Sequence, residues 1–236
     1  MTRIISIETS TALCSAALSE DTHIVAFKES REPKAHAALT AKFVKEMLDE
    51  NGLRLQDCDA VCVSMGPGSY SGLRVGVSIA KGLCFGGKLP LLATGTLDVL
   101  VQQAIEGGLL PDGCKYIVPM IDARRMEAYT AVFTAGGEQI RETKPEIFTQ
   151  DSYLGLLEEG PVLFIGDAAG KCATVISHTS ASFCECCPKA SSMPALAMRE
   201  YKEKRLRDVA YFEPFYLKEF VATVSRKNIL PGKQSS

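Results

Sequence analysis

Apolar and polar residues follow two different periods in the first third of the chain. Three short β-rich segments, separated by turn-compatible residues, come first: RIISIET at residues 3–9, CSAALSE at 14–20 and HIVAFKE at 23–29. Such closely spaced segments are typical of an antiparallel meander. Residues 35–50 (AHAALTAKFVKEMLDE) then repeat apolar side chains at helical spacing and stop at Asn51-Gly52, which predicts an amphipathic helix.

The chain next alternates between apolar runs and helical patterns. These segments are DAVCVSM at 59–65, a helix from Ser71, PLLATG at 90–95, and a helix over 96–106 that stops at Gly107-Gly108. Unbroken apolar runs are typical of strands that are covered on both faces. The predicted order of the first half is therefore β-β-β-α-β-α-β-α.

The second half repeats this scheme. Its segments are YIVPMIDARR at 116–125, the hairpin MEAYTAVFTAGGEQI at 126–140, a helix around 151–158, and the strand, glycine turn and helix of VLFIGDAAGK at 162–171. Two halves of similar plan predict an α/β protein with two related lobes. We place an N-terminal lobe at 1–98, a C-terminal lobe at 99–220 and a polar tail at 221–236.

Composition narrows the choice of partners. With 236 residues, of which 46% are hydrophobic, the chain can bury a substantial core. A net charge of −2 gives no overall attraction to nucleic acid or to a membrane. The start, MTRIISIETS, is too short an apolar run for a signal peptide, and no stretch approaches the roughly 18 apolar residues of a membrane span. We therefore expect a cytoplasmic protein without membrane contact.

The nine cysteines are mostly placed as small apolar residues. Four of them stand singly in apolar runs: Cys14, Cys58, Cys62 and Cys84. The exception is FCECCPK, which holds Cys184, Cys186 and Cys187 but lacks the paired CxxC spacing of zinc ribbons. We expect a loop with incidental thiols here, and no metal site.

The stretch SMGPGSYSGLRVGVSIAKGL, residues 64–83, follows a predicted strand and allows two interpretations. A strand, a glycine-rich turn and a helix can bind an anion through backbone amides. However, Leu73 follows Gly72 where a Walker loop has lysine, and the GxGxxxG spacing is not that of a dinucleotide site. A tight turn whose glycines permit positive φ is the favoured interpretation.

The helix of this stretch is apolar around most of its circumference. Its polar residues form one narrow stripe: Ser71, Arg74, Ser78 and Lys81. Such a helix is either central to the core, or buried against its own sheet on one side and a partner on the other. We assign a flat partner-binding face to Gly72, Leu73, Gly76, Val77 and Ala80.

Four segments, in order, resemble the TsaB family of tRNA threonylcarbamoyladenosine biosynthesis proteins, once filed with glycoproteases. They are IETST, SMGPGSYSGLRVGVSIAKGL, IDARRMEAYTAVF and FIGDAA, and the resemblance extends over about residues 1–220. It implies a two-lobed actin-like, sugar-kinase-like (RNase H-like) fold. It also implies a role in modifying the adenosine next to the anticodon of tRNAs that read ANN codons.

The resemblance also directs attention to a nucleotide site. Actin-like ATPases place an acid and small hydroxyl residues in the first hairpin, and the counterparts here are Glu8, Thr9 and Ser10. The catalytic relative TsaD continues with an acid, which this chain replaces by Thr11-Ala12-Leu13. One carboxylate is poor support for a magnesium triphosphate. Gly166 and Asp167 stand where actin-like folds receive adenosine, so these five residues are candidates for a vestigial nucleotide site, with no cofactor and at most weak nucleotide binding.

Metallopeptidase chemistry lacks its ligands in this sequence. TsaD binds a metal through a histidine pair spaced HxxxH, whereas His36 is followed four residues later by Thr40. Neither HExxH nor another ligand set is present. We therefore expect no peptidase activity and no bound metal.

Each of two charged segments allows two interpretations. IDARRMEAY brings Asp122, Arg124, Arg125 and Glu127 together, either as an internal ion-pair cluster or as a contact surface for a partner or for RNA phosphates. MREYKEKRLRD, residues 198–208, is either a solvated helix face or a tRNA contact. PFYLKEF, residues 214–220, is predicted to return to the body of the protein.

The resemblance implies a noncatalytic scaffold subunit that binds and stabilises a TsaD-like enzyme, in a complex that also holds a TsaE-like ATPase. The chain would contact tRNA indirectly and form a homodimer when alone. The alternative is an ATPase or small-molecule kinase of the same fold. Tight nucleotide binding with magnesium distinguishes the two.

Overall fold

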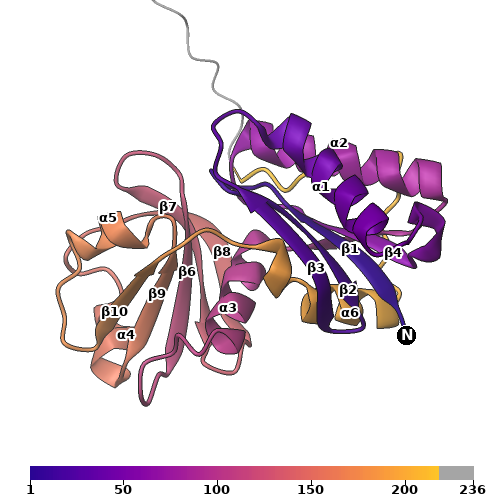
Figure 1. Cartoon of the computed structure of the whole chain (residues 1–236). Helices are drawn as coiled ribbons and strands as arrows, with labels where there is room; N and C mark the ends of the chain where they lie inside the picture. Colours follow the sequence, from indigo (N-terminus) through magenta and orange to yellow (C-terminus); the bar gives the residue numbers. More distant parts are fainter. Residues whose placement is uncertain (218–236) are drawn as a thin grey trace, which may run out of the picture.

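A computed structural model describes residues 1–217 of the chain, and residues 218–236 lie outside the described part. The predicted tail at 221–236 and the end of the predicted C-terminal lobe fall among the latter. The described residues form two five-stranded mixed sheets, in the orders β3-β2-β1-β4-β5 and β10-β9-β6-β7-β8 (Figure 1). In each sheet, a three-strand meander is extended by two further strands, which confirms the two related lobes.

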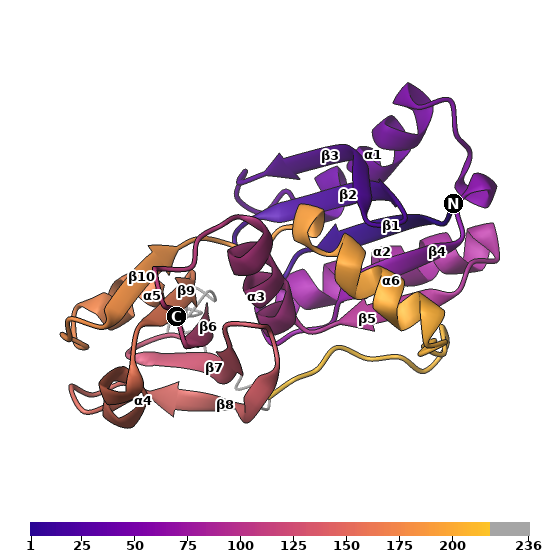
Figure 2. The ribbon, with the colours of Figure 1, turned by 90° about the horizontal axis from the view of Figure 1, so that it is seen from below.

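The first sheet contains the predicted opening meander. Its antiparallel strands are β1 (Arg3–Glu8), β2 (Cys14–Glu20) and β3 (His23–Ser30), and β4 (Ala60–Ser64) and β5 (Leu91–Thr94) extend it in parallel from β1. Helices α1 (His36–Glu50) and α2 (Tyr70–Gly87) cover one face, and α6 (Pro194–Lys202) covers the other (Figures 1 and 2). A short 3-10 turn, η1 (Leu55–Asp57), precedes β4.

The second sheet repeats the plan. Its strands are β6 (Tyr116–Asp122), β7 (Glu127–Thr134), β8 (Gln139–Ile147), β9 (Val162–Gly166) and β10 (Ala181–Glu185). Helices α4 (Leu154–Glu159) and α5 (Ala169–Ala173) lie on one side, and α3 (Thr96–Glu106) lies between the lobes (Figure 2). The first three residues of FCECCPK, 183–185, belong to β10, so the loop predicted there was wrong for them, Cys184 included. The cause is that a short edge strand with polar and thiol side chains has no clear apolar pattern.

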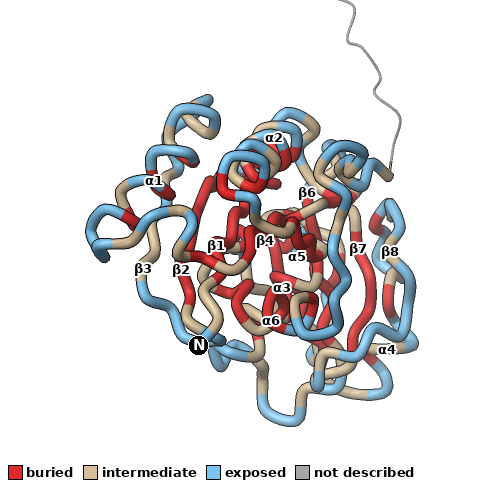
Figure 3. Tube along the Cα trace, turned by 90° about the vertical axis from the view of Figure 1, so that its right-hand side faces the viewer, coloured by how far each residue is buried: buried red, intermediate tan, exposed pale blue. Residues whose placement is uncertain are grey.

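The apolar runs of the sequence became strands covered on both faces. Every residue of β4, β5 and β9 is buried, as the runs predicted. Figure 3 shows this burial for β4. Helix α3 contributes to both lobes, because Val99 packs with the first sheet while Leu100 packs with the second. The boundary that we placed at residues 98/99 falls inside this helix and stays a prediction. Within residues 1–217, no helix has the length and apolarity to cross a membrane.

The end of the described chain returns to the first lobe. After β10, the 3-10 turn η2 (Ala190–Ser192) and α6 pack on the first sheet, where the amide of Ala190 donates to Ser15 Oγ at 2.9 Å. Arg207 then pairs with Leu91 at the edge of β5. The following segment passes along α2 and reaches Met65, whose carbonyl accepts from the Phe215 amide at 2.7 Å. The predicted return of residues 214–217 to the body is confirmed.

Candidate functional site

The glycine-rich turn before α2 is pressed against the loop between β1 and β2. The amide of Ser69 donates to the carbonyl of Ser10 at 2.7 Å, and the Ser69 side chain accepts from the Gly72 amide to cap α2. A Cβ added at Gly68 would lie 2.6 Å from the Ser10 carbonyl oxygen, and one added at Gly72 would lie 2.1 Å from that of Thr9. Glycine is needed at both positions because two backbones approach closely.

The five residues that we assigned to partner binding point toward the chain's own first sheet instead. Gly72, Leu73, Gly76, Val77 and Ala80 are all buried, and Val77 and Ala80 belong to the core formed with β1 and β4. A Cβ added at Gly76 would lie 2.2 Å from Thr9 Oγ1. Side chains in this position are not available to a partner, which corrects the assignment.

The opposite side of α2 is open. Ser71, Arg74 and Ser78 are exposed, as their polar stripe predicted. We define the outer α2 face by the residues beside this stripe: Val75, Ile79, Gly82, Phe85 and Gly86. Val75 and Ile79 are half-buried, and a Cβ added at Gly82 or Gly86 would meet nothing within 4 Å. The Phe85 side chain is 85% exposed. The neighbouring α1 adds three exposed alanines, Ala37, Ala38 and Ala41.

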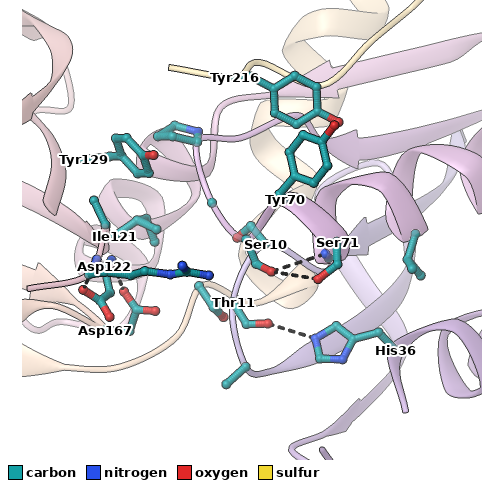
Figure 4. Close-up of a pocket in the computed structure, with 18 of the residues that line it drawn as sticks. Ser10, Thr11, His36, Tyr70, Ser71, Ile121, Asp122, Tyr129, Asp167 and Tyr216 are labelled. Carbon is teal, nitrogen blue, oxygen red and sulfur yellow. Dashed lines mark hydrogen bonds between the residues drawn. The ribbon is translucent and has the colours of Figure 1, made fainter. Parts of the chain in front are cut away.

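A cavity of about 900 Å³ lies between the two lobes (Figure 4). The first lobe lines it with Ser10, Thr11, Lys34, His36 and Tyr70, among others, the second with Ile121, Asp122, Arg124, Tyr129 and Asp167, and the C-terminal segment with Phe215, Tyr216 and Leu217. Nε2 of His36 donates to the Thr11 carbonyl at 2.9 Å, so this histidine fixes the β1–β2 loop. Within residues 1–217, no group of three or more His, Cys, Asp or Glu side chains is arranged to share a metal ion.

The five candidates for a vestigial nucleotide site divide into two groups. Ser10 and Asp167 line the cavity, whereas Glu8, Thr9 and Gly166 do not. The Glu8 side chain is 0% exposed, and Oε1 accepts from the Ser10 amide at 2.6 Å while Oε2 has no hydrogen-bond partner. Burial raises the pKa of Glu8, which favours its neutral form.

Thr9 and Gly166 each make close contacts inside their own lobe. The Thr9 hydroxyl donates to the Gly72 carbonyl at 2.8 Å inside the first lobe. Gly166 has φ +135°, and a Cβ there would lie 2.0 Å from the Met120 carbonyl oxygen, so only glycine allows β9 to end so close to β6. Both residues therefore have structural explanations.

Lys171 organises the charged residues of the second lobe. Its ammonium group pairs with the Asp122 carboxylate and donates to the carbonyls of Arg125, at 2.9 Å, and Glu127, at 2.5 Å. The Asp122 amide donates to Asp167 Oδ1 at 2.8 Å. Burial raises the pKa of Asp167 to about 6. Of the two acids in IDARRMEAY, Asp122 thus forms an ion pair, and its cation, Lys171, is one that our sequence interpretation had not singled out.

Tyr70 and Tyr216 form a second feature of the cavity that the sequence did not reveal. Their ring centroids are 4.8 Å apart, and the Arg74 guanidinium lies 4.2 Å from the centroid of the Tyr70 ring. The pair lies on the opposite side of the cavity from Asp122 and Asp167 (Figure 4). The only signal in the sequence was the aromatic content of PFYLKEF, which we interpreted as packing.

Comparisons with known proteins were consistent with one family. A family model described as TsaD, tRNA N6-adenosine threonylcarbamoyltransferase, matches residues 30–225. The Escherichia coli (strain K12) protein named tRNA threonylcarbamoyladenosine biosynthesis protein TsaB is 30% identical, over 98% of this chain and 100% of its own length. A Haemophilus influenzae protein of the same name is 28% identical over 98% of both chains.

Coverage distinguishes the two kinds of relative. A Paracoccus denitrificans protein named tRNA N6-adenosine threonylcarbamoyltransferase is 32% identical, but the match covers 61% of this chain and only 35% of that protein. A Pseudomonas aeruginosa crystal structure, of an uncharacterized protein with similarity to peptidase YEAZ, shares the fold with a TM-score of 0.80 and 24% identity, over 92% of this chain and all of its own. The chain matches the Escherichia coli and Haemophilus influenzae proteins named TsaB over 98–100% of their length, and it belongs to the TsaB family.

Proposed function

We propose that this chain is a noncatalytic subunit of the complex that forms threonylcarbamoyladenosine in tRNAs reading ANN codons, where it binds and stabilises a TsaD-like catalytic subunit. A TsaE-like ATPase belongs to the same complex, which works in the cytoplasm. The names of two relatives that match this chain along nearly their full length support a role in forming threonylcarbamoyladenosine. The outer α2 face is the observation that supports the partner.

The outer α2 face has the properties of a helix-packing surface. Gly82 and Gly86 are one turn apart with open space above both, so the backbone of a second helix can approach closely. Phe85 exposes an aromatic ring, the kind of side chain that anchors interfaces. Covering an exposed phenylalanine stabilises an association by about 2 kcal/mol.

A TsaD-like protein is the partner that fits this face. The family model that carries the TsaD name matches residues 30–225, a range that includes α1 and α2. A TsaD-like subunit therefore has a counterpart of this lobe and can offer a related helix. The same geometry lets two copies of this chain pair about a two-fold axis when the partner is absent.

The cavity is consistent with a role that does not depend on ATP turnover. Its neighbouring acid, Glu8, is buried away from it, and Asp122 and Asp167 line one side with carboxylates, which repel a triphosphate. The volume of about 900 Å³ is the observation that favours the second candidate, an ATPase or small-molecule kinase. Weak nucleotide binding is compatible with both.

Two substitutions on the outer α2 face test the proposal. Phe85→Asp places a charge in the contact, and Gly82→Leu fills the space above the helix. Either should weaken binding to the TsaD-like subunit, measured by calorimetry, by about a hundredfold or more. Light scattering should show the same loss for self-association. Both variants should melt near the wild-type temperature, because neither residue contributes to the core.

Ile147→Asp is the matched control, because Ile147 is an exposed apolar residue of the second lobe. It should leave both associations unchanged. Normal pairing of Phe85→Asp and Gly82→Leu would remove the interface. Tight binding of ATP with magnesium to the isolated chain would favour the kinase or ATPase instead.

A further inference from the structure

The β6–β7 turn presents two arginines on a tip that is held in place from behind. Arg124 and Arg125 have φ of +69° and +51°, a conformation that is uncommon for residues other than glycine. The Arg124 amide donates to Asp122 Oδ1 at 2.9 Å, and Lys171 ties the Arg125 and Glu127 carbonyls together. The tip is therefore preorganised, which reduces the entropy lost when it binds a ligand.

The guanidinium groups of this tip have no counter-ion among residues 1–217. Both arginines are exposed, and within residues 1–217 no carboxylate lies within ion-pair distance of either. Arg124 lines the cavity between the lobes, and Lys34, exposed and likewise without an ion pair, lines the same cavity from the first lobe. Cations from both lobes thus stand on the rim of one opening.

A pair of tyrosine rings in contact shares this rim. Tyr216 is 36% exposed and lies against Tyr70. The Arg74 guanidinium lies over the Tyr70 ring. Exposed tyrosine rings beside cations are a combination that binds single-stranded nucleic acid, because each base offers a π-face and each nucleotide one phosphate.

The opposite side of the cavity disfavours a compact polyphosphate. Asp122 and Asp167 face it there, and Lys171, which pairs with Asp122, is also engaged by two backbone carbonyls. A ligand with its charges spread along a backbone can use Lys34 and Arg124 without entering this acidic side. A triphosphate concentrates its charge and gains less.

We propose that the rim of the interlobe cavity binds the single-stranded anticodon loop of tRNA directly, with phosphates on Arg124, Arg125 and Lys34 and a base stacked on Tyr216. The choice of tRNA rests on the proposed function. This contact with tRNA is direct, whereas the sequence led us to expect an indirect one.

The test measures RNA binding by the full chain, without its partner. The probe is a fluorescent anticodon stem-loop of a tRNA that reads an ANN codon, titrated over a range of potassium chloride concentrations. Arg124→Gln combined with Arg125→Gln should weaken binding about tenfold or more. It should also make the negative slope of log affinity against log salt concentration shallower by about 1.4, because two phosphate contacts are lost and each contributes about 0.7. Tyr216→Ala should weaken binding about tenfold and leave the slope unchanged, since stacking releases no counterions.

The chain offers matched controls for both substitutions. Lys202 and Lys204 are exposed cations of the α6 region without an ion pair among residues 1–217, and Lys204 also has a positive φ of +54°. Lys202→Gln with Lys204→Gln should leave affinity within about twofold of wild type. Tyr211→Ala removes a tyrosine that is 84% exposed and does not line the cavity, and it should likewise have no effect.

Several outcomes would overturn the inference. They are unchanged affinity in the arginine pair, equal loss in the lysine pair, equal binding of a blunt RNA duplex, and displacement of the stem-loop by ATP with magnesium. The proposed function is tested separately with Phe85→Asp, which should lose the TsaD-like partner while keeping the RNA. A wild-type chain that binds the TsaD-like subunit but not the RNA would contradict only this inference. A wild-type chain that binds the RNA but not that subunit would contradict only the proposed function.

Discussion

Thr9 and Gly72 hold the first hairpin and α2 in a fixed relation. The Thr9 hydroxyl donates to the Gly72 carbonyl at 2.8 Å, while the Thr9 carbonyl oxygen occupies the space that a Cβ on Gly72 would need. One turn later, Gly76 packs on the same hydroxyl. A small displacement of α2 therefore moves the loop that carries Ser10 and Thr11 at the cavity.

Gly76→Ala should destabilise the fold. The added Cβ would lie 2.2 Å from Thr9 Oγ1, so the hydroxyl must move and its bond to Gly72 is disturbed. We expect the free energy of unfolding in urea to fall by about 1–3 kcal/mol. Gly82→Ala, in the same helix with open space, should instead raise it by up to about 1 kcal/mol. Equal effects of the two substitutions would contradict this packing.

Asp167→Asn should change how stability depends on pH. Burial raises the pKa of Asp167 from 3.8 to about 6, so between about pH 4 and 6 the folded chain binds more protons than the unfolded chain. The free energy of unfolding contributed by this group falls as pH rises through that window. The variant keeps an acceptor for the Asp122 amide and should be more stable than wild type near neutral pH. Its advantage should shrink toward pH 4; a difference independent of pH would refute the assignment.

Lys171→Met should loosen the β6–β7 turn. The substitution leaves the Asp122 carboxylate without its cation and the Arg125 and Glu127 carbonyls without their donor. We expect a loss of about 1–3 kcal/mol in the free energy of unfolding and faster amide hydrogen exchange at the turn. Lys189→Met breaks an ion pair with Glu29 in which the lysine is more exposed than Lys171, 36% against 22%, and should cost under about 1 kcal/mol. Unchanged exchange at the turn in Lys171→Met would show that the tip is held by other contacts.

The isolated chain should release phosphate from ATP no faster than buffer does. Glu8, the acid at the end of β1 beside the β1–β2 loop, is buried outside the cavity. Glu8→Gln keeps an acceptor for the Ser10 amide and should unfold at a similar urea concentration, whereas Glu8→Ala leaves a void. Turnover that survives repurification and disappears in Glu8→Gln would assign this carboxylate a catalytic role.

Most strands and helices could be predicted because their signals are local. The apolar runs of β4 and β9 and the helical period of α1 depend only on neighbouring residues. The return of the chain to the first lobe could not be predicted in this way. Its contacts, such as that of Ala190 with Ser15, join residues 175 positions apart.

The orientation of α2 was harder to predict for a similar reason. Its sequence is apolar on nearly every side, so the pattern fixes the exposed stripe at Ser71, Arg74 and Ser78 and leaves two candidate faces. The choice depends on where Thr9 lies, since only its carbonyl and hydroxyl require Gly72 and Gly76. Lys171 and Tyr216 were missed because their partners lie in distant segments.

The return of residues 190–217 to the first lobe determines the order in which the two lobes can complete their folding during synthesis. The second sheet is formed by a continuous stretch, residues 116–185, and can close as soon as that stretch has left the ribosome. The first sheet is translated earlier, yet one of its faces is covered in part by α3 and otherwise by Met193, Leu196 and the rest of the α6 region. The N-terminal lobe therefore waits for the C-terminal residues, with apolar side chains of β1 and β4 open to chaperones in the interval. The half that is made first is the half that is completed last.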